Sequence, residues 1–327
     1  KKFMEENTEQ RVDLTLFSEK IQELKDRIAS VIVGQEQTVD LVLTAILANG
    51  HVLIEGVPGV AKTLLARLTA RLIDADFSRV QFTPDLMPSD VLGTTVFNMK
   101  TNGFDFHQGP IFADIVLVDE INRAPAKTQA ALFEVMEERQ ISIDGTTHRM
   151  GDLYTILATQ NPVEQEGTYK LPEAQLDRFL MKITMDYPSL EEEVNILERH
   201  HTNAALVKLD DIVPAITKEE LLSLRAFMNQ VFVDRTLLQY IALIVQQTRT
   251  SKAVYLGASP RASVAMLQSS KAYALLQGRD FVTPEDIKFV APYVLQHRLI
   301  LTAEAEMEGY SPVKVTQRLI DKVEVPK

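Results

Sequence analysis

Gly56-Val57-Pro58-Gly59-Val60-Ala61-Lys62-Thr63 is the stretch that decides the fold of this chain. Residues 51–55 before it, with the apolar centre Val52-Leu53-Ile54, are typical of a strand, and the leucines of residues 63–73 after it recur at helical spacing. A glycine-rich turn from a strand into a helix, closed by Lys and Thr, is the pattern of a phosphate-binding loop. Backbone N–H groups of such a loop and the N-terminus of its helix bind phosphate oxygens.

The loop predicts a role for each of its last residues. Lys62 is expected to reach the β- and γ-phosphates of a nucleotide, and the Thr63 hydroxyl is expected to bind Mg²⁺. Ala61 stands where such loops usually have glycine, and its methyl group is acceptable if the backbone φ angle there is negative. The residues predicted to hold the nucleotide here are Gly56, Val57, Pro58, Gly59, Val60, Ala61, Lys62, Thr63 and Leu64.

Two further polar segments follow apolar strands. Residues 115–118 form an uninterrupted aliphatic run that ends in Asp119-Glu120, and residues 153–158 are followed by Thr159-Gln160-Asn161-Pro162. The carboxyl ends of parallel strands face the crevice where α/β sheets bind ligands. We therefore expect Asp119 in the Mg²⁺ shell, Glu120 polarising the attacking water, and Asn161 holding that water or the γ-phosphate. Taken alone, Asp119-Glu120 is equally typical of a solvated loop, and Asn161-Pro162 is more typical of an ordinary turn.

The order of elements predicts two domains. Strands at 51–55, 79–82, 115–118, 153–158 and 179–185 alternate with helical segments, which is typical of a parallel five-stranded sheet covered by helices. Beyond Tyr187-Pro188 the pattern is all helical, with capping boxes that begin at Ser189 and Thr217. We predict an α/β nucleotide-binding domain over residues 10–187, with a hairpin insert near 94–108, and a helical lid over 188–327.

Composition limits the class of protein. The 327 residues are 46% apolar and 24% charged, which is ordinary for a globular protein. The net charge of −11 argues against a general nucleic-acid binder, because phosphate backbones are held by clustered Lys and Arg. No apolar run is long enough to span a membrane, and Lys1–Glu6 has no apolar core typical of a signal peptide. The absence of cysteine excludes disulfides, thiolate metal sites and cysteine nucleophiles and fits a reducing compartment. We expect a cytoplasmic protein.

Taken together, the motifs resemble those of AAA+ ATPases, and the residues within them resemble the MoxR family. The resemblance extends from Val31 to Leu299. It rests on the loop at 56–63, Asp119-Glu120, Asn161, residues 171–179 (Leu-Pro-Glu-Ala-Gln-Leu-Asp-Arg-Phe) and Ser259-Pro260-Arg261, which follow one another in the family's order.

The resemblance implies a Mg²⁺-dependent ATPase that assembles as a homo-oligomeric, hexameric ring. Arg178 matches the arginine that reaches the ATP of a neighbouring subunit, although a salt bridge with Asp177 or another acid is the alternative. Arg261 matches a second arginine that acts on its own or on a neighbour's nucleotide, and an ordinary exposed arginine is the alternative. Val33-Gly34-Gln35 resembles the segment that lies against adenine, with a simple turn as the alternative.

The same resemblance implies a chaperone-like role in maturing or activating other proteins. This role includes metallocofactor insertion and partners with von Willebrand factor A domains. Residues 94–108 and 140–146 are typical of hairpins that would project toward the pore of a ring. They offer few cations, mainly Lys100 and Arg149, which disfavours DNA as the molecule in the pore. A DNA-translocating motor and an ATP-controlled scaffold with little turnover are the alternatives.

Overall fold

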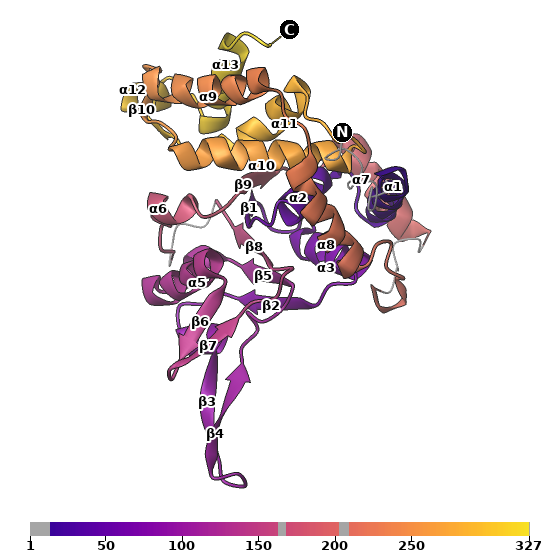
Figure 1. Cartoon of the computed structure of the whole chain (residues 1–327), viewed down its shortest axis with the longest axis vertical. Coiled ribbons are helices and arrows are strands. Elements are labelled where there is room, and N and C mark those ends of the chain that lie inside the picture. Colours follow the sequence, from indigo (N-terminus) through magenta and orange to yellow (C-terminus); the bar gives the residue numbers. More distant parts are fainter. Residues whose placement is uncertain (1–13, 163–167, 203–208, 327) are drawn as a thin grey trace, which may run out of the picture.

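A computed structural model describes residues 14–162, 168–202 and 209–326 of the chain (Figure 1). The expectation about a signal peptide concerns residues 1–6, which lie outside these ranges. Across the described ranges, no helix has the combination of length and apolar character that is needed to cross a bilayer.

A parallel sheet of five strands forms the centre of the molecule, as the sequence predicted. Its order is β2-β5-β8-β1-β9, and every neighbouring pair is parallel. The strands are β1 (Val52–Gly56), β2 (Phe77–Gln81), β5 (Ile115–Asp119), β8 (Thr155–Gln160) and β9 (Met181–Met185). All five residues of β5 are buried, which explains its unbroken aliphatic sequence: both faces of a central parallel strand are covered.

Alternate residues of β5 belong to different hydrophobic cores. Ile115 and Leu117 belong to the core that also contains residues of α1 (Leu14–Val31), α2 (Glu36–Leu47) and α3 (Lys62–Leu72). Val116 and Val118 point to the other face and pack with α5 (Ala126–Glu138). The period of two along the strand therefore builds a three-layer α/β/α arrangement. Short helical segments complete it: α4 (Pro88–Leu92), η1 (Ile121–Arg123) and α6 (Glu173–Leu176).

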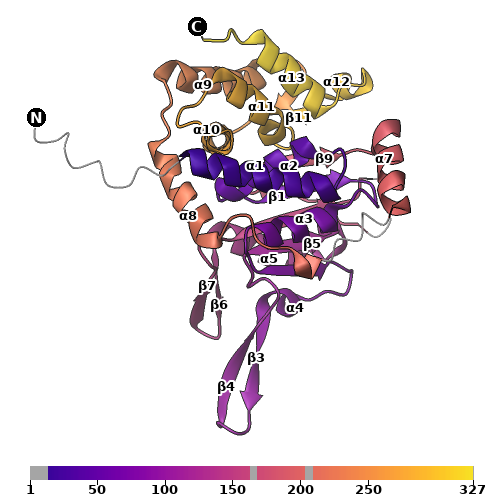
Figure 2. The same ribbon diagram turned by 90° about the vertical axis from the view of Figure 1, so that its right-hand side faces the viewer.

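Two hairpins extend from the end of the molecule opposite the lid (Figures 1 and 2). The longer one pairs β3 (Gly93–Asn98) with β4 (Gly103–Gln108), and the shorter one pairs β6 (Gln140–Ile143) with β7 (Thr146–Arg149). Both lie where the sequence predicted hairpins. Phe106 anchors the longer hairpin, since its ring lies 4.2 Å from that of His148 and 5.8 Å from that of Phe112.

The C-terminal part is helical, as predicted, apart from one small sheet. The predicted capping boxes are present: Ser189 precedes α7 (Leu190–His201), and Thr217 precedes α8 (Lys218–Phe227). Two short strands, β10 (Val254–Leu256) and β11 (Ile300–Leu301), form an antiparallel pair that the helical spacing did not indicate. The other elements are η2 (Leu209–Asp211), η3 (Met228–Gln230), α9 (Arg235–Thr250), α10 (Pro260–Leu276), α11 (Pro284–Leu295), α12 (Ala303–Met307) and α13 (Pro312–Lys322).

Residues 296–298 of the lid form one set of hydrogen bonds to the α/β part. The Arg298 guanidinium donates from Nη2 to the carbonyl of Phe179 at 2.7 Å and from Nε to Asp177 at 2.6 Å. The His297 ring nitrogen Nε2 lies 3.0 Å from the same Phe179 carbonyl, and Gln296 donates to the backbone of β9. We call residues 296–298 and 177–182 the seam. The division near residue 187 stays a prediction.

Candidate active site

The predicted phosphate loop joins the carboxyl end of β1 to the first turn of α3. Gly59 has φ +89°, and no described atom lies within 4 Å of the position that a Cβ atom would take there. This part of the loop therefore borders open space, and left-handed residues next to a helix start form a concave row of N–H groups. Thr63 lies in the first turn of α3, directly after Lys62.

The condition stated for Ala61, a negative φ, is not met. Ala61 precedes α3 with φ +60° and ψ 23°, in the left-handed region. The chain must turn at this residue from the loop into the helix, and the left-handed conformation makes that turn. A residue with a Cβ atom pays about 1–2 kcal/mol for it. Ala61 is thus a strained residue at the loop, which the motif alone did not reveal.

The Lys62 side chain bends back over its own loop. Its Nζ donates to the carbonyl oxygens of Gly56 and, at 3.2 Å, of Val57. Partial burial lowers the pKa of Lys62, while the nearby carboxylates of Asp119 and Glu120 act in the opposite direction. The charge of Lys62 is therefore felt by both predicted acids, and its present acceptors are carbonyl groups that phosphate oxygens would replace.

Asp119 ends β5 as a buried carboxylate with two partners. Its Oδ2 accepts from Arg79 Nε at 2.6 Å, and its Oδ1 accepts from the Thr159 hydroxyl at 3.1 Å. The same Thr159 hydroxyl accepts from the backbone N–H of Glu120 at 3.0 Å. Thr159 therefore ties the ends of β5 and β8 together and fixes the orientation of Asp119.

Glu120 has a left-handed backbone, with φ 56° and ψ 51°, which turns its side chain out of the strand direction. Its Oε2 accepts from Gln81 Nε2 at 2.8 Å and lies 2.8 Å from Arg123 Nε in an ion pair. The carboxylate predicted to polarise water is thus held by side chains from β2 and η1. Asn161 follows β8, between the ends of β1 and β5, and is buried.

The segment Val33-Gly34-Gln35 lies between α1 and α2, next to α7. Gly34 has φ +72°, a left-handed conformation that favours glycine, and an added Cβ atom would stand 2.2 Å from the Glu192 carboxylate, which would have to move. Gln35 accepts at its side-chain oxygen from the Thr38 hydroxyl at 2.9 Å. Because α7 directly follows β9, which pairs with β1 as far as Gly56, this segment belongs to the phosphate-loop edge of the sheet.

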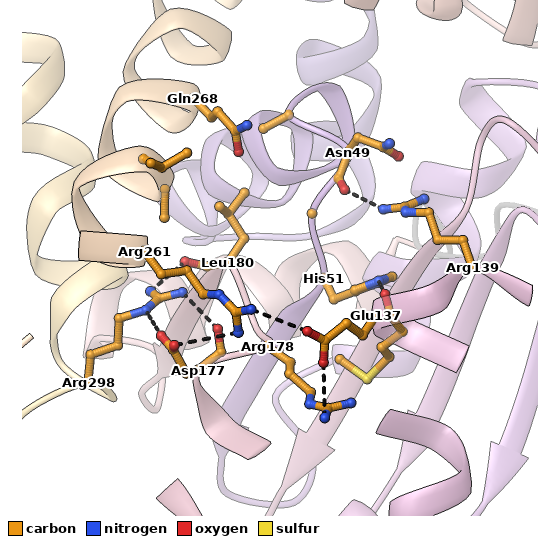
Figure 3. A pocket seen from close by; sticks show the side chains of 15 residues that line it. Asn49, His51, Glu137, Arg139, Asp177, Arg178, Leu180, Arg261, Gln268 and Arg298 are labelled. Carbon is orange, nitrogen blue, oxygen red and sulfur yellow. Dashed lines mark hydrogen bonds and ion pairs between the residues drawn. The ribbon is translucent and has the colours of Figure 1, made fainter. Parts of the chain in front are cut away.

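Arg178 and Arg261 meet at the amino edge of the sheet, where its strands begin and opposite the carboxyl edge, where they end (Figure 3). One carboxylate bridges them: Glu137 Oε2 lies 3.0 Å from Arg178 Nη2, and Glu137 Oε1 lies 3.2 Å from Arg261 Nη2. Arg261 also lies 3.7 Å from Asp177. These residues line a cavity of about 220 Å³ together with residues 48–51, which precede β1, and Leu180, which precedes β9. We call this the arginine edge.

A buried histidine, His51, lines the cavity of the arginine edge. The His51 Nδ1 atom accepts from the backbone N–H of Ile156 at 3.0 Å, and Nε2 lies 3.1 Å from the carbonyl of Met136. This pattern requires a neutral ring with the proton on Nε2. Burial, together with the charge of Arg139, lowers the pKa of His51 to about 3.

The structure therefore divides the predicted residues into two groups. Lys62, Thr63, Asp119, Glu120 and Asn161 gather at the carboxyl edge, whereas both arginines lie at the amino edge. Sequence reasoning missed four residues that hold these groups in place. Gln81 and Thr159 could have been found, because Gln81 is the last residue of β2 and Thr159 is the penultimate residue of β8; Arg123 and Glu137 carry no such signal. The four are Gln81, Arg123, Thr159 and Glu137.

This sheet order, with a phosphate loop after the first strand, paired acids after β5 and a helical lid, defines an AAA+ ATPase fold. The comparisons agree. Residues 51–181 match the model of the ATPase family associated with various cellular activities, and residues 246–321 match the AAA lid domain.

Similar proteins show which family of AAA+ ATPases the chain resembles. The chain is 47% identical to YeaC of Bacillus subtilis over 92% of this chain and 93% of that protein. It is 44% identical to Chaperone MoxR1 of Mycobacterium tuberculosis, over 92% and 81%. A crystal structure of a candidate ATPase from Cytophaga hutchinsonii superposes with a TM-score of 0.88 at 40% identity, covering 96% of this chain and 97% of that one. The chain belongs to the MoxR family of AAA+ ATPases.

Proposed function

We propose that this protein hydrolyses ATP with Mg²⁺ in a ring of its own copies, hexameric by family resemblance. The observation that carries the proposal is the separation of the two groups: the phosphate loop and both acids lie at one edge of the sheet, and Arg178 and Arg261 lie at the other. Besides Lys62, a nucleotide on the loop needs a further cation at the transferred phosphate, and both arginines of its own subunit lie at the opposite edge. A neighbouring copy supplies it when the two edges face each other.

Within one subunit, the carboxyl edge binds and positions the nucleotide. The loop amides and Lys62 bind the phosphates, and Val33-Gly34-Gln35 borders the base. Glu120 accepts a hydrogen bond from the attacking water once its bonds to Gln81 and Arg123 are exchanged, and Asn161 orients that water. The Thr63 hydroxyl and the Asp119 carboxylate are hard oxygen donors that suit Mg²⁺, which neutralises phosphate charge when bound.

Across the interface, Arg178 and Arg261 act on the neighbour's phosphates. A guanidinium stays charged and forks onto two oxygens, which suits the charge that spreads over the transferred phosphoryl group. Because Arg261 shares Glu137 with Arg178, we propose that it also acts in trans rather than on its own nucleotide. Glu137 keeps the pair together until the phosphates of a neighbour replace it.

The β3–β4 hairpin supports a polypeptide client. Phe97 and Phe104 are exposed and stack edge to face at 5.3 Å, and Met99 at the turn is also exposed. Lys100 is the cation of this hairpin, and Asp105 opposes it in charge. An aromatic hairpin end whose single lysine is balanced by an acid contacts apolar side chains better than a phosphate backbone. We therefore propose a chaperone-like action on proteins, including metallocofactor insertion and von Willebrand factor A domain partners, in the cytoplasm where ATP is available.

The test measures ATP hydrolysis per subunit against protein concentration, for the parent, Glu120→Gln and Arg178→Ala. We expect specific activity to rise with concentration in the parent and to be lost in both variants. Glu138→Gln, an exposed acid next to Glu137, is the control and should match the parent. Flat activity with no effect of Arg178→Ala would show a site complete in one subunit. DNA-stimulated hydrolysis would favour a DNA motor, and negligible turnover in every condition a scaffold.

A further inference from the structure

We propose that an apolar stripe on α7 packs against the arginine edge of a neighbouring copy of this chain and so forms part of the contact that completes the active site. This inference rests on the proposed function, because it concerns how the ring forms. The stripe consists of Leu190, Val194 and Leu197.

The stripe is an unusual surface for a helix in a folded protein. Leu190, Val194 and Leu197 are 82%, 46% and 64% exposed, and none of the twelve residues of α7, all of which the structure describes, is buried. The spacing of four and then three residues puts the three side chains on one helical face. A contiguous apolar row rimmed by charged residues marks a contact surface, whereas single exposed leucines do not.

The opposite face of α7 is fixed to the body of the protein. Arg199 donates from Nη1 to the carbonyl oxygens of Ala29 and Ser30 at 3.1 and 2.7 Å, at the end of α1. The Glu192 carboxylate stands against Gly34 and caps the helix with Ser189. The helix is therefore held in place, and its apolar stripe faces outward.

The position of α7 favours a second copy of this chain as the partner that covers the stripe. The helix follows β9, whose last residue Met185 pairs with Gly56 at the start of the phosphate loop. Figure 1 shows α7 on one side of the sheet and α6, next to Arg178, on the other. A neighbour whose Arg178 approaches the phosphate loop of this subunit must bring its arginine edge close to α7.

The arginine edge is complementary to α7 in apolar character and in charge. Val264, one turn after Arg261 on α10, is 54% exposed and lines the same cavity as Arg261. Leu256 on β10, three residues before the helix cap, is also exposed. The first turn of α7 carries Glu191 and Glu193 beside the stripe, opposite in sign to the arginines. Such pairing of charges sets the register of a contact.

The experiment compares Val194→Ser/Leu197→Ser with the parent by sedimentation velocity and by ATPase activity against protein concentration. We expect assembly and half-maximal specific activity to require at least tenfold more protein, while the affinity of the subunit for a fluorescent ATP analogue changes less than twofold. Leu238→Ser/Leu243→Ser changes two exposed leucines on α9 and is the matched control. Assembly of Val194→Ser/Leu197→Ser at the parent's concentration would overturn the inference.

A mixing experiment tests which edge carries the stripe. Val194→Ser/Leu197→Ser and Arg178→Ala are expected to be nearly inactive alone, at a concentration where the parent is assembled. Mixed, they should regain part of the activity. At one kind of interface, the stripe variant supplies an intact Arg178, and the Arg178→Ala subunit supplies an intact α7 and nucleotide site. No gain on mixing would contradict the placement of the stripe.

The outcomes separate this inference from the function on which it rests. If the parent itself neither assembles nor gains activity with concentration, the proposed ring mechanism fails. If the parent assembles and the stripe variant does too, only the role of α7 fails. If deleting residues 1–13 exposes an apolar site for a fluorescent dye while assembly stays unchanged in the stripe variant, that segment is the occupant and the second copy is excluded.

Discussion

The two edges of the parallel sheet hold their polar groups in different ways. At the carboxyl edge, backbone turns shape the chain, since Ala61 and Glu120 both adopt left-handed conformations, and polar side chains such as Thr159 hold the acids. At the arginine edge, ion pairs between elements far apart in sequence do the positioning, as Glu137 on α5 does for Arg178 and Arg261. The phosphate loop is thus preorganised by local chain geometry, whereas the arginines depend on ion pairs with side chains that can exchange partners.

This difference fits the tasks that we propose for the two edges. Phosphate binding needs fixed N–H groups, which only the backbone supplies in a row. An arginine that serves a neighbour must be held while it waits and released when the neighbour's phosphate arrives. A bridging carboxylate does both, because an exposed ion pair is worth only about 0.2–1 kcal/mol.

The largest expected effect separates binding from catalysis at the two edges. Lys62→Ala and Arg178→Ala should each lower ATP hydrolysis by about 10³-fold or more, since both remove a cation that stabilises the transferred phosphoryl group. Only Lys62→Ala should also weaken ATP binding to a single subunit, measured by fluorescence titration at low protein concentration. Arg235→Ala, an exposed arginine on α9, is the control. An equal loss of ATP binding in Arg178→Ala would contradict the assignment of nucleotide binding to the carboxyl edge alone.

The second prediction concerns pH and the arginine edge. The folded protein keeps His51 neutral, with a pKa of about 3 against an ordinary value of 6.5. Between these values the unfolded chain binds a proton that the folded chain does not, so the free energy of unfolding falls as pH falls. From pH 7.5 to 5.5 this amounts to about 1.4 kcal/mol.

The measurement is urea unfolding of the parent and of His51→Gln at both pH values. Other groups contribute to the total slope, so the informative quantity is the difference between the two proteins. His51→Gln is less stable at both pH values but should lose about 1.4 kcal/mol less than the parent on acidification. Equal losses would mean that His51 is protonated in the folded protein.

The third prediction tests the strain at the carboxyl edge. Ala61→Gly should raise the free energy of unfolding by up to about 1 kcal/mol, because glycine adopts a positive φ without a steric penalty. Ala130→Gly, on the exposed face of α5, should lower it by about 1 kcal/mol, because glycine is unfavourable inside a helix. Chemical denaturation of both variants gives the comparison. The same sign for both would show that Ala61 is not strained.

The smallest expected effect concerns the bridge at the arginine edge. Glu137→Gln should lower the free energy of unfolding by less than about 1 kcal/mol, because both of its ion pairs are partly exposed. Hydrolysis in the assembled ring should fall while ATP binding to one subunit is unchanged, since the arginines lose a common orientation. Glu138→Gln is the matched control. A loss of several kcal/mol would identify Glu137 as a structural residue.

The sequence was informative where the signal is local. The strand-loop-helix around Lys62, the acids after β5 and the hairpins could be predicted because each depends on neighbours in the chain. The backbone of Ala61 could not, because the motif does not fix φ at that position. Nor could the partners of Glu120 and Glu137, since Gln81 lies 39 residues from Glu120 and Arg261 lies 124 residues from Glu137. Such pairs exist only once the layers have packed.

The seam has a consequence for how the subunit moves. Arg298 and its neighbours bind the carbonyl groups and the carboxylate of the segment that carries Arg178, while Arg261 begins a helix of the same lid. A rotation of the lid would therefore move Arg178 and Arg261 together. In a ring built from such subunits, the movement would take place at the interface between two copies rather than at a hinge inside each copy.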